Sequence, residues 1–172
     1  MFSIRPVSRL TSILSVIFVA AMSLSLRAAI AEKPGQTELP QPTMGQLPGD
    51  VVRIVIEALA HNDKPYTDAG IATTFAFASP ANKVNTGPVQ KFTQMVRTSA
   101  YRIMIDHLEH EFSEVILMGS VAYQMVRIRS VKGDEAFFAF RLSQQAGGRF
   151  DGMWMTDAVS PVASGDIPDQ TF

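Results

Sequence analysis

The chain has 172 residues, of which 47% are hydrophobic and 18% are charged, so it is long and apolar enough for one packed domain and is not intrinsically disordered. Its formal net charge of -1 gives no electrostatic reason to expect a nucleic-acid partner, which usually needs a strong basic excess. Cysteine is absent, which excludes disulfides, thiolate metal sites and a cysteine nucleophile.

Residues 1–31 are predicted to be a signal peptide. The segment has no acidic residue, carries Arg5 ahead of an apolar run, and ends with Ala29 and Ala31, which fit the small-x-small rule for cleavage. The mature chain would then begin near Glu32 and be exported to a periplasm, the cell exterior or a thylakoid lumen. Two alternatives stay open: an uncleaved membrane anchor, because the apolar run is at the short limit for a span, and an organelle presequence, because the leader lacks acids.

Two segments rich in proline and glycine or small polar residues frame the predicted domain. Residues 32–49 are expected to be an extended, exposed linker, because such segments leave few backbone donors and little apolar surface to bury. Residues 161–172 have the same character and are expected to form a flexible tail. The folded domain is therefore predicted over residues 50–160.

The first helix is predicted over the stretch PGDVVRIVIEALAHND. Asp50 is a residue type that favours the N-cap position, so we expect it to cap this helix. A helical stripe of apolar residues indicates the face that packs in the core: Val51, Ile54, Val55, Ala58 and Leu59.

Two further helices are predicted on either side of the stretch SPANKVNTG. The first of them ends at Pro80, because the residue before a proline resists the helical conformation. The second is expected to be capped by Thr86 and to carry Pro88 in its first turn, where the missing N–H costs nothing. The stretch between them is interpreted as a turn, in which Asn82 and Asn85 serve turn geometry.

After residue 99 the apolar period changes from three-to-four to two, which predicts strands at YRIMID, SVAYQMVRIRS, EAFFAFRLS and GMWMTDAV. In the second of these, one face is expected to carry Ala122, Gln124, Val126 and Ile128. The glycine-bearing connections VKGDE and QQAGGRFDG are typical of hairpin turns. Helices followed by a meander of antiparallel strands predict an α+β fold.

The motifs TTFAFASPANK, TGP, FTQMVR, AYRIM and LSQQ…GMWMTDAV resemble a family of domains of unknown function, number 4864, over about residues 50–160. The order of elements also resembles the nuclear-transport-factor-2-like superfamily, which includes ketosteroid isomerase and SnoaL-type proteins. That resemblance implies a cone-shaped barrel, with about three N-terminal helices packed on a strongly curved antiparallel sheet of four to six strands. It implies a pocket between the helices and the sheet, but no particular reaction.

Enzymes on such a fold pair a carboxylate base with a tyrosine or a protonated acid. The resemblance makes Asp68, Tyr101 and Asp106 the catalytic candidates, although their spacing carries no signature of a catalytic pair. For Tyr101 the alternative is a half-buried strand aromatic whose hydroxyl is bonded locally. The candidates for a ligand pocket are Phe75, Phe92, Tyr101, Gln124 and Trp154.

Two groups of charged or metal-ligating residues follow the predicted helices. His107 and His110 flank Glu109, but on a strand the two rings would point to opposite faces, and no third ligand is evident, so no metal site is predicted. A cationic run on one strand could receive an anionic ligand, but it is interpreted as an exposed face that keeps a sheet edge soluble: Arg127, Arg129 and Lys132.

Trp154 is interpreted as a core residue of a central C-terminal strand. Tyr123, Met125, Met153 and Met155 are expected to form an apolar patch on the sheet face that the helices leave uncovered. Such a face normally indicates a partner, and we expect a homodimer through it. An error of one residue in the strand register would exchange the two faces.

The preferred interpretation is an exported or organelle-lumen module without catalytic activity, which binds a small apolar ligand or a protein partner. One alternative is a small isomerase, hydratase or cyclase that uses a carboxylate–tyrosine pair. Another is an accessory subunit of a membrane complex, with the leader still attached. Convergence of Asp68, Tyr101 and Asp106 in one pocket would favour the enzyme. No cofactor is expected, and membrane association is expected only if the leader stays uncleaved.

Overall fold

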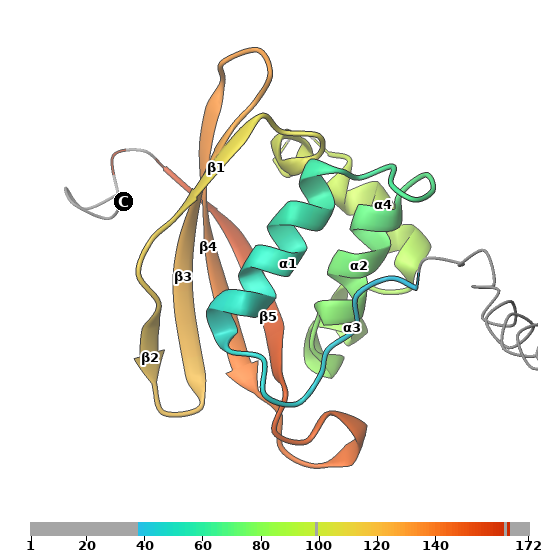
Figure 1. Ribbon diagram of the computed structural model, residues 1–172, viewed down its shortest axis with the longest axis vertical. Coiled ribbons are helices and arrows are strands. Elements are labelled where there is room, and N and C mark those ends of the chain that lie inside the picture. The colour runs from blue at the N-terminus through green and yellow to red at the C-terminus, as the bar shows by residue number, and fades with distance from the viewer. Residues whose placement is uncertain (1–37, 99, 164, 166–172) are drawn as a thin grey trace, which may run out of the picture. The chain divides into compact units, whose positions relative to one another are not determined.

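A computed structural model describes residues 38–98, 100–163 and 165, and the predicted leader and part of the predicted linker lie outside them (Figure 1). In these ranges four α-helices come first and a five-stranded antiparallel sheet follows, so the predicted α+β class is confirmed. The helices are α1 (Pro48–Ala60), α2 (Ala69–Phe77), α3 (Pro80–Thr86) and α4 (Val89–Val96), with short 3-10 turns η1 (Arg102–Met104) and η2 (Gly148–Phe150). The strands are β1 (Glu109–Phe112), β2 (Ile116–Met118), β3 (Val121–Arg129), β4 (Glu135–Gln144) and β5 (Trp154–Val162). No helix of the described part is long and apolar enough to cross a membrane.

Helix α1 begins two residues before Asp50, the predicted cap. Leu47 is the N-cap, and Pro48 stands in the first turn, where a proline needs no N–H partner. The Asp50 carboxylate instead accepts a hydrogen bond from the Leu47 N–H at 3.0 Å, so it stabilises the helix start from inside the first turn. The apolar face of this helix is buried, as predicted, through Val51, Val55 and Leu59.

The stretch SPANKVNTG contains a helix, α3, where the sequence predicted only a turn. Ser79 is its N-cap, and the Ser79 hydroxyl accepts a hydrogen bond from the Asn82 N–H at 3.2 Å. Pro80 therefore starts this helix, besides standing after the end of α2. Thr86 is the last residue of α3 and does not cap α4, which begins after Pro88.

Helices α1 and α2 approach each other closely at Gly70. A Cβ atom built on Gly70 would lie 2.2 Å from the Ala58 carbonyl oxygen and 2.9 Å from the Asn62 Cα. The Gly70 N–H also donates a hydrogen bond to the Asn62 carbonyl at 2.9 Å. Only a residue without a side chain fits this contact between two backbones.

The prediction of a strand at residues 101–106 is wrong, because these residues form η1 and the residues next to it. The Met104 N–H bonds to the Tyr101 carbonyl at 3.0 Å, and the Asp106 N–H bonds to the Leu59 carbonyl at 2.9 Å. These bonds satisfy the backbone without a neighbouring strand, and six residues of alternation were too few to decide between the two structures. The sheet instead begins at β1, in the segment of Glu109 and His110, for which the sequence predicted no metal site.

The alternation predicted for the two long strands is confirmed. β3 and β4 pair along their length, from Val121 opposite Ser143 to Arg129 opposite Glu135. Their shared core face is buried and packs against α1 and α2: Ala122, Gln124, Val126, Ile128, Phe138, Phe140 and Leu142.

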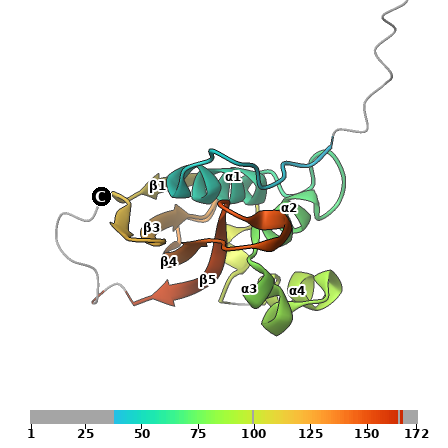
Figure 2. The ribbon, with the colours of Figure 1, turned by 90° about the horizontal axis from the view of Figure 1, so that it is seen from below.

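The sheet is open and is neither closed nor strongly curled, which corrects the expected cone-shaped barrel (Figures 1 and 2). Its order is β1-β3-β4-β5, with β2 also paired to β3, so β5 is an edge strand and not the predicted central one. Closure would require the two edges to meet, and too few strands separate β1 from β5 for that. Helix α1 covers one face (Figure 2), while no helix of the described residues covers the other.

Candidate functional site

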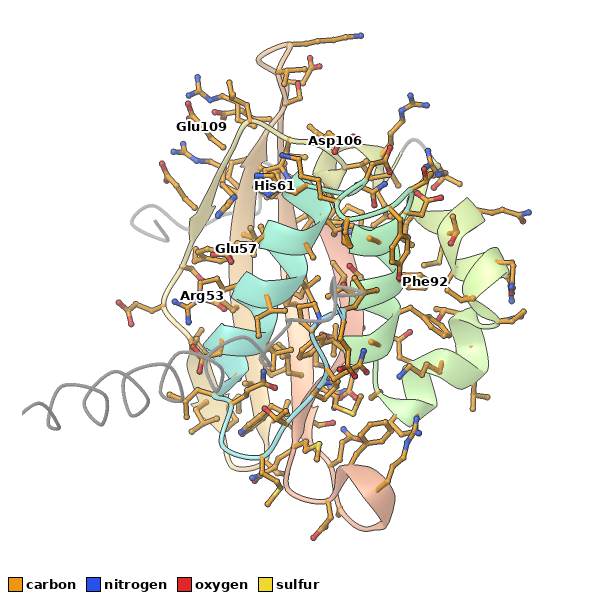
Figure 3. All side chains as sticks on the ribbon, turned by 45° about the vertical axis from the view of Figure 1, so that its right-hand side comes forward. Arg53, Glu57, His61, Phe92, Asp106 and Glu109 are labelled. Carbon is orange, nitrogen blue, oxygen red and sulfur yellow. The ribbon has the colours of Figure 1, made fainter. Side chains whose placement is uncertain are left out.

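A pocket of about 230 Å³ is lined mainly by residues of α2, α3, α4, η1 and the edge strand β5. Figure 3 labels Phe92, whose ring extends from α4 toward α2 and forms part of the wall. The wall is mainly apolar: Leu59, Ala78, Phe92, Met95, Val96, Met104, Ala158 and Val159. Most of its polar residues lie on α3 (Asn82, Asn85 and Thr86) and at the start of β5 (Thr156 and Asp157). The other two are Thr74 on α2 and Tyr101, which precedes η1.

Thr156 brings an unused hydroxyl to this pocket. The side chain is 5% exposed, and its Oγ1 has no hydrogen-bond partner in the described part of the chain. The Thr156 carbonyl, by contrast, accepts two bonds, from the Ser79 N–H at 2.8 Å and the Asn82 Nδ2 at 3.1 Å. A buried polar atom without a partner costs about 1–3 kcal/mol. The lining of the pocket therefore includes one residue whose buried hydroxyl has no partner in the described part of the chain.

Tyr101 is half-buried as predicted, but its hydroxyl is not bonded locally. It donates to the Val159 carbonyl at 3.2 Å, across 58 residues of sequence, and its ring stacks on Phe138 with centroids 6.2 Å apart. Because the phenolic proton is already engaged with a backbone carbonyl, Tyr101 serves the pocket as a fixed wall.

Asp68 and Asp106, the two carboxylate candidates, lie outside the pocket lining. Both hydrogen-bond to Asn62, which is buried at the end of α1: Asp68 Oδ1 accepts from its side chain at 3.0 Å, and Asp106 Oδ1 accepts from its backbone at 3.2 Å. Figure 3 shows Asp106 beside His61, at the C-terminal end of α1. Among the described residues, no hydrogen bond joins any two of Asp68, Tyr101 and Asp106, so these three do not converge.

The charge of Asp68 has a structural role. Burial alone would raise its pKa, but the hydrogen bonds from Asn62 and Arg97, together with the Arg97 charge, outweigh burial and hold the pKa below its usual value. Arg97 Nη2 lies 2.5 Å from the carboxylate. A carboxylate stabilised in its charged form between two donors is a poor general base.

The other predicted pocket residues are only partly in place. Phe75 stands behind Phe92, with ring centroids 5.2 Å apart. Gln124 lies on the core face of β3 and donates to the Ser113 carbonyl at 2.9 Å, and Trp154 is a core residue that is 8% exposed. Neither Gln124 nor Trp154 lines the pocket.

The sequence interpretation missed the residues that α3 contributes. Asn82, Asn85 and Thr86 are spaced three and four apart, so they share one side of a helix. That spacing was the available signal, and interpreting the stretch as a turn concealed it. Thr156 had no comparable signal, because its position depends on a bulge that shifts the register between β4 and β5.

The predicted interface residues do not form one patch. Tyr123 is 39% exposed and Met125 is half-buried, both on the sheet face away from the helices. Met155 pairs with Ser143 on that same face, yet it is fully buried within the chain and offers no surface. Met153 precedes β5 and lines a different groove. Of the four residues expected to form the patch, only Tyr123 and Met125 contribute surface on this face.

His107 and His110 lie together, contrary to the expectation that they point to opposite faces. His107 precedes β1, and its Nε2 lies 2.9 Å from Nδ1 of His110, while its Nδ1 bonds to the Met104 carbonyl at 2.8 Å. Burial, with the nearby His110 charge, lowers the pKa of His107. In the ranges that the structure describes, no three His, Cys, Asp or Glu side chains gather as a metal site would require.

The cationic strand run is neutralised by its neighbours on β1. Arg127 pairs with Glu111 at 2.6 Å, and Arg129 pairs with Glu109. This arrangement agrees with an exposed sheet face rather than an anion site. Lys132 lies in the turn that follows β3 and is exposed.

Comparison with known proteins gives one match. A family model described as a domain of unknown function (DUF4864) matches residues 49–163, a range that contains the whole pocket lining. No curated protein and no solved structure gave a significant match.

Proposed function

Because the chain belongs to the DUF4864 family, whose description carries no activity, we propose from its own pocket that the protein is a non-catalytic module that binds a small, mainly apolar molecule. The observation that carries the proposal is an apolar pocket with one unsatisfied hydroxyl, that of Thr156. Such a combination of apolar walls and a few polar groups is typical of small-molecule sites.

The size of the pocket limits the ligand. A cavity of about 150 Å³ holds benzene, and pockets for drug-sized ligands begin near about 300 Å³. At about 230 Å³, this pocket suits a molecule with one substituted ring or a short branched chain. The ligand should carry one hydroxyl or carbonyl group for Thr156.

The charges around the pocket favour binding over catalysis. Asp157 is the one carboxylate residue of the lining, and its oxygens accept hydrogen bonds from Arg141 and Ser143 at 2.5 and 3.0 Å. Tyr101 is engaged with Val159. An isomerase, hydratase or cyclase would need a base within reach of its substrate. In the described lining, both Asp157 and Tyr101 are already engaged in hydrogen bonds within the protein.

Binding of phenol to the full chain tests the proposal. In NMR titrations, phenol should shift the methyl signals of Met95 and Met104, which line the pocket. Thr156→Val should weaken phenol binding about fivefold while leaving toluene binding unchanged, because it removes one hydrogen bond and keeps the shape. Val159→Trp, at a half-buried wall position that pairs with Phe140 on the core face, should abolish binding of both.

Ser160→Trp is the matched control, because Ser160 is exposed on the same strand, pairs with Ala139, and lies outside the lining. It should bind both compounds like the wild type. If the Val159→Trp variant bound both compounds as tightly as the wild type, the ligand would lie elsewhere and this pocket would be rejected.

We propose a second function for the helix-free sheet face: contact with a second copy of the chain. The proposal is supported by an exposed apolar strip on β2 and β3, with Ile116 62% and Met118 65% exposed beside Tyr123. Ion pairs of Arg127 with Glu111 and of Arg141 with Asp157 border the strip, giving the apolar centre and polar rim that interfaces show.

Met125→Glu should convert a dimer to a folded monomer in sedimentation, because it places a charge next to Tyr123 on the same face of β3. Val84→Glu is the control, since Val84 is 83% exposed on α3, away from this face. A folded Met125→Glu protein with the mass of the wild type would contradict the dimer. An unfolded one would mean that Met125 belongs to the core.

We also propose, from sequence, that the module is exported and distantly related to the nuclear-transport-factor-2-like superfamily. The order of helices before an antiparallel sheet supports the relationship, although the sheet is flatter than the resemblance implied. Export rests on the leader at residues 1–31, which lies outside the described residues. A retained leader would favour the accessory subunit of a membrane complex.

A further inference from the structure

A second groove, of about 240 Å³, receives Lys83 of α3, which does not line the apolar pocket. Its walls come from the segment before α1, the α2–α3 region and the loop that carries η2. Gln41, Ala76, Lys83, Arg149 and Phe150 are among its lining residues, and none of these lines the apolar pocket.

Lys83 is held in a fixed position at this groove. Its Nζ donates to the Ala76 carbonyl at 2.9 Å and lies 5.5 Å from the ring centre of Phe75 and 5.4 Å from that of Phe150. An ammonium group has three N–H donors, and this arrangement uses one of them. The remaining donors are available to a ligand in the groove.

Arg149 brings a second positive charge to the same ring. Its guanidinium carbon lies 4.4 Å from the centre of Phe150. Within residues 38–98, 100–163 and 165, neither Lys83 nor Arg149 forms an ion pair, and the charged residues of the groove are these two cations alone. Arg127 and Arg141 on the sheet, by contrast, each have a carboxylate partner.

Two cations near one ring, without a counter-charge, repel each other and attract an anion. Burial of Lys83 lowers its pKa, and the Arg149 charge lowers it further. An anion bound between the two would reverse both effects, because it favours the charged form of each cation. Arginine can also bind two oxygens of one carboxylate or phosphate at once.

We propose that Lys83 and Arg149 form a binding site for a small oxyanion, either the carboxylate of an organic acid or the phosphate of a monoester. The site is independent of the apolar pocket and would stand if that pocket bound nothing. Its ligand is defined by charge and geometry. It is an anion with two or more oxygens on one atom, which can contact the exposed Arg149 and the half-buried Lys83 of the groove.

Calorimetric titration of the full chain at low ionic strength, with inorganic phosphate and with acetate as probes, tests the site, because neither probe carries the ring expected for the apolar pocket. Amide NMR signals of residues 147–150 should shift on binding. Arg149→Gln should weaken binding about tenfold, the effect of removing a charged hydrogen-bonding group. Lys83→Met, which keeps the length of the side chain, should weaken it similarly. Because Arg149 is exposed, its variant should fold normally.

Arg102→Gln is the control, since it removes the same charge from an exposed position on η1, outside the groove. Binding of phosphate alone would assign a phosphate site, binding of acetate alone a carboxylate site, and binding of both an oxyanion site in general. Absence of binding by either probe would overturn the proposal. An equal loss in Arg102→Gln and Arg149→Gln would also overturn it, because net charge alone would then explain the affinity.

Discussion

Replacing Gly70 by alanine should lower the free energy of unfolding by about 3 kcal/mol, the upper part of the range for overpacking a close contact. The new methyl group would lie 2.2 Å from the Ala58 carbonyl oxygen and 2.8 Å from the Ala58 carbonyl carbon. Both are backbone atoms of α1 and cannot rotate away as a side chain can. Helix α2 would have to move off α1, breaking the 2.9 Å bond from Gly70 to Asn62.

Urea denaturation, followed by circular dichroism, measures this effect. Gly165→Ala is the matched control, because a methyl group there meets no atom within 4 Å and the backbone is not in the left-handed region. The control should unfold at the wild-type midpoint. If Gly70→Ala did so too, α1 and α2 would not pack as closely as described.

The second large effect is expected for Phe92→Ala, which should cost about 3 kcal/mol, as for other buried aromatic truncations. Phe92 is 5% exposed and packs against Phe75, so its removal leaves a void between α4 and α2. The void would join the apolar pocket, and water entering it would meet mainly apolar walls. The thermal midpoint should fall accordingly.

Gln90→Ala on the same helix is the control, since Gln90 is exposed. It should leave the midpoint within the small range typical of surface changes. A Phe92→Ala protein as stable as the wild type would show that α4 contributes little to the core.

Prediction from the sequence was most successful where the two-residue alternation of apolar side chains continued without interruption over a long strand. The nine residues of β3 alternate strictly, and the face that carries Val126 and Ile128 is buried as expected. The same rule failed at residues 101–106, because bonds from Met104 to Tyr101 and from Asp106 to Leu59 satisfy the backbone locally. A short alternating segment has no property that distinguishes a strand from a 3-10 turn.

The candidate site was predictable only through its large side chains. Of the five candidates for a ligand pocket, Phe92 and Tyr101 lie in the lining. The position of Thr156 follows from the register shift between Arg141 and Leu142, which a single sequence does not encode visibly. The cone shape was an expectation from the resemblance alone, and no residue pattern specified how far the sheet would curl.

Helix α3 has seven residues and contributes side chains to two separate hollows, Asn82, Asn85 and Thr86 to one and Lys83 to the other. A ligand that displaces this helix on binding at one hollow also displaces the residues that α3 contributes to the other, and the two affinities are then linked although each site can bind alone. Thermodynamic linkage makes the effect reciprocal: whatever factor the first ligand applies to the affinity of the second, the second applies to the first. Helix α3 would then couple the two hollows. The coupling free energy is measured as the difference between the binding free energy of one ligand in the presence and in the absence of the other.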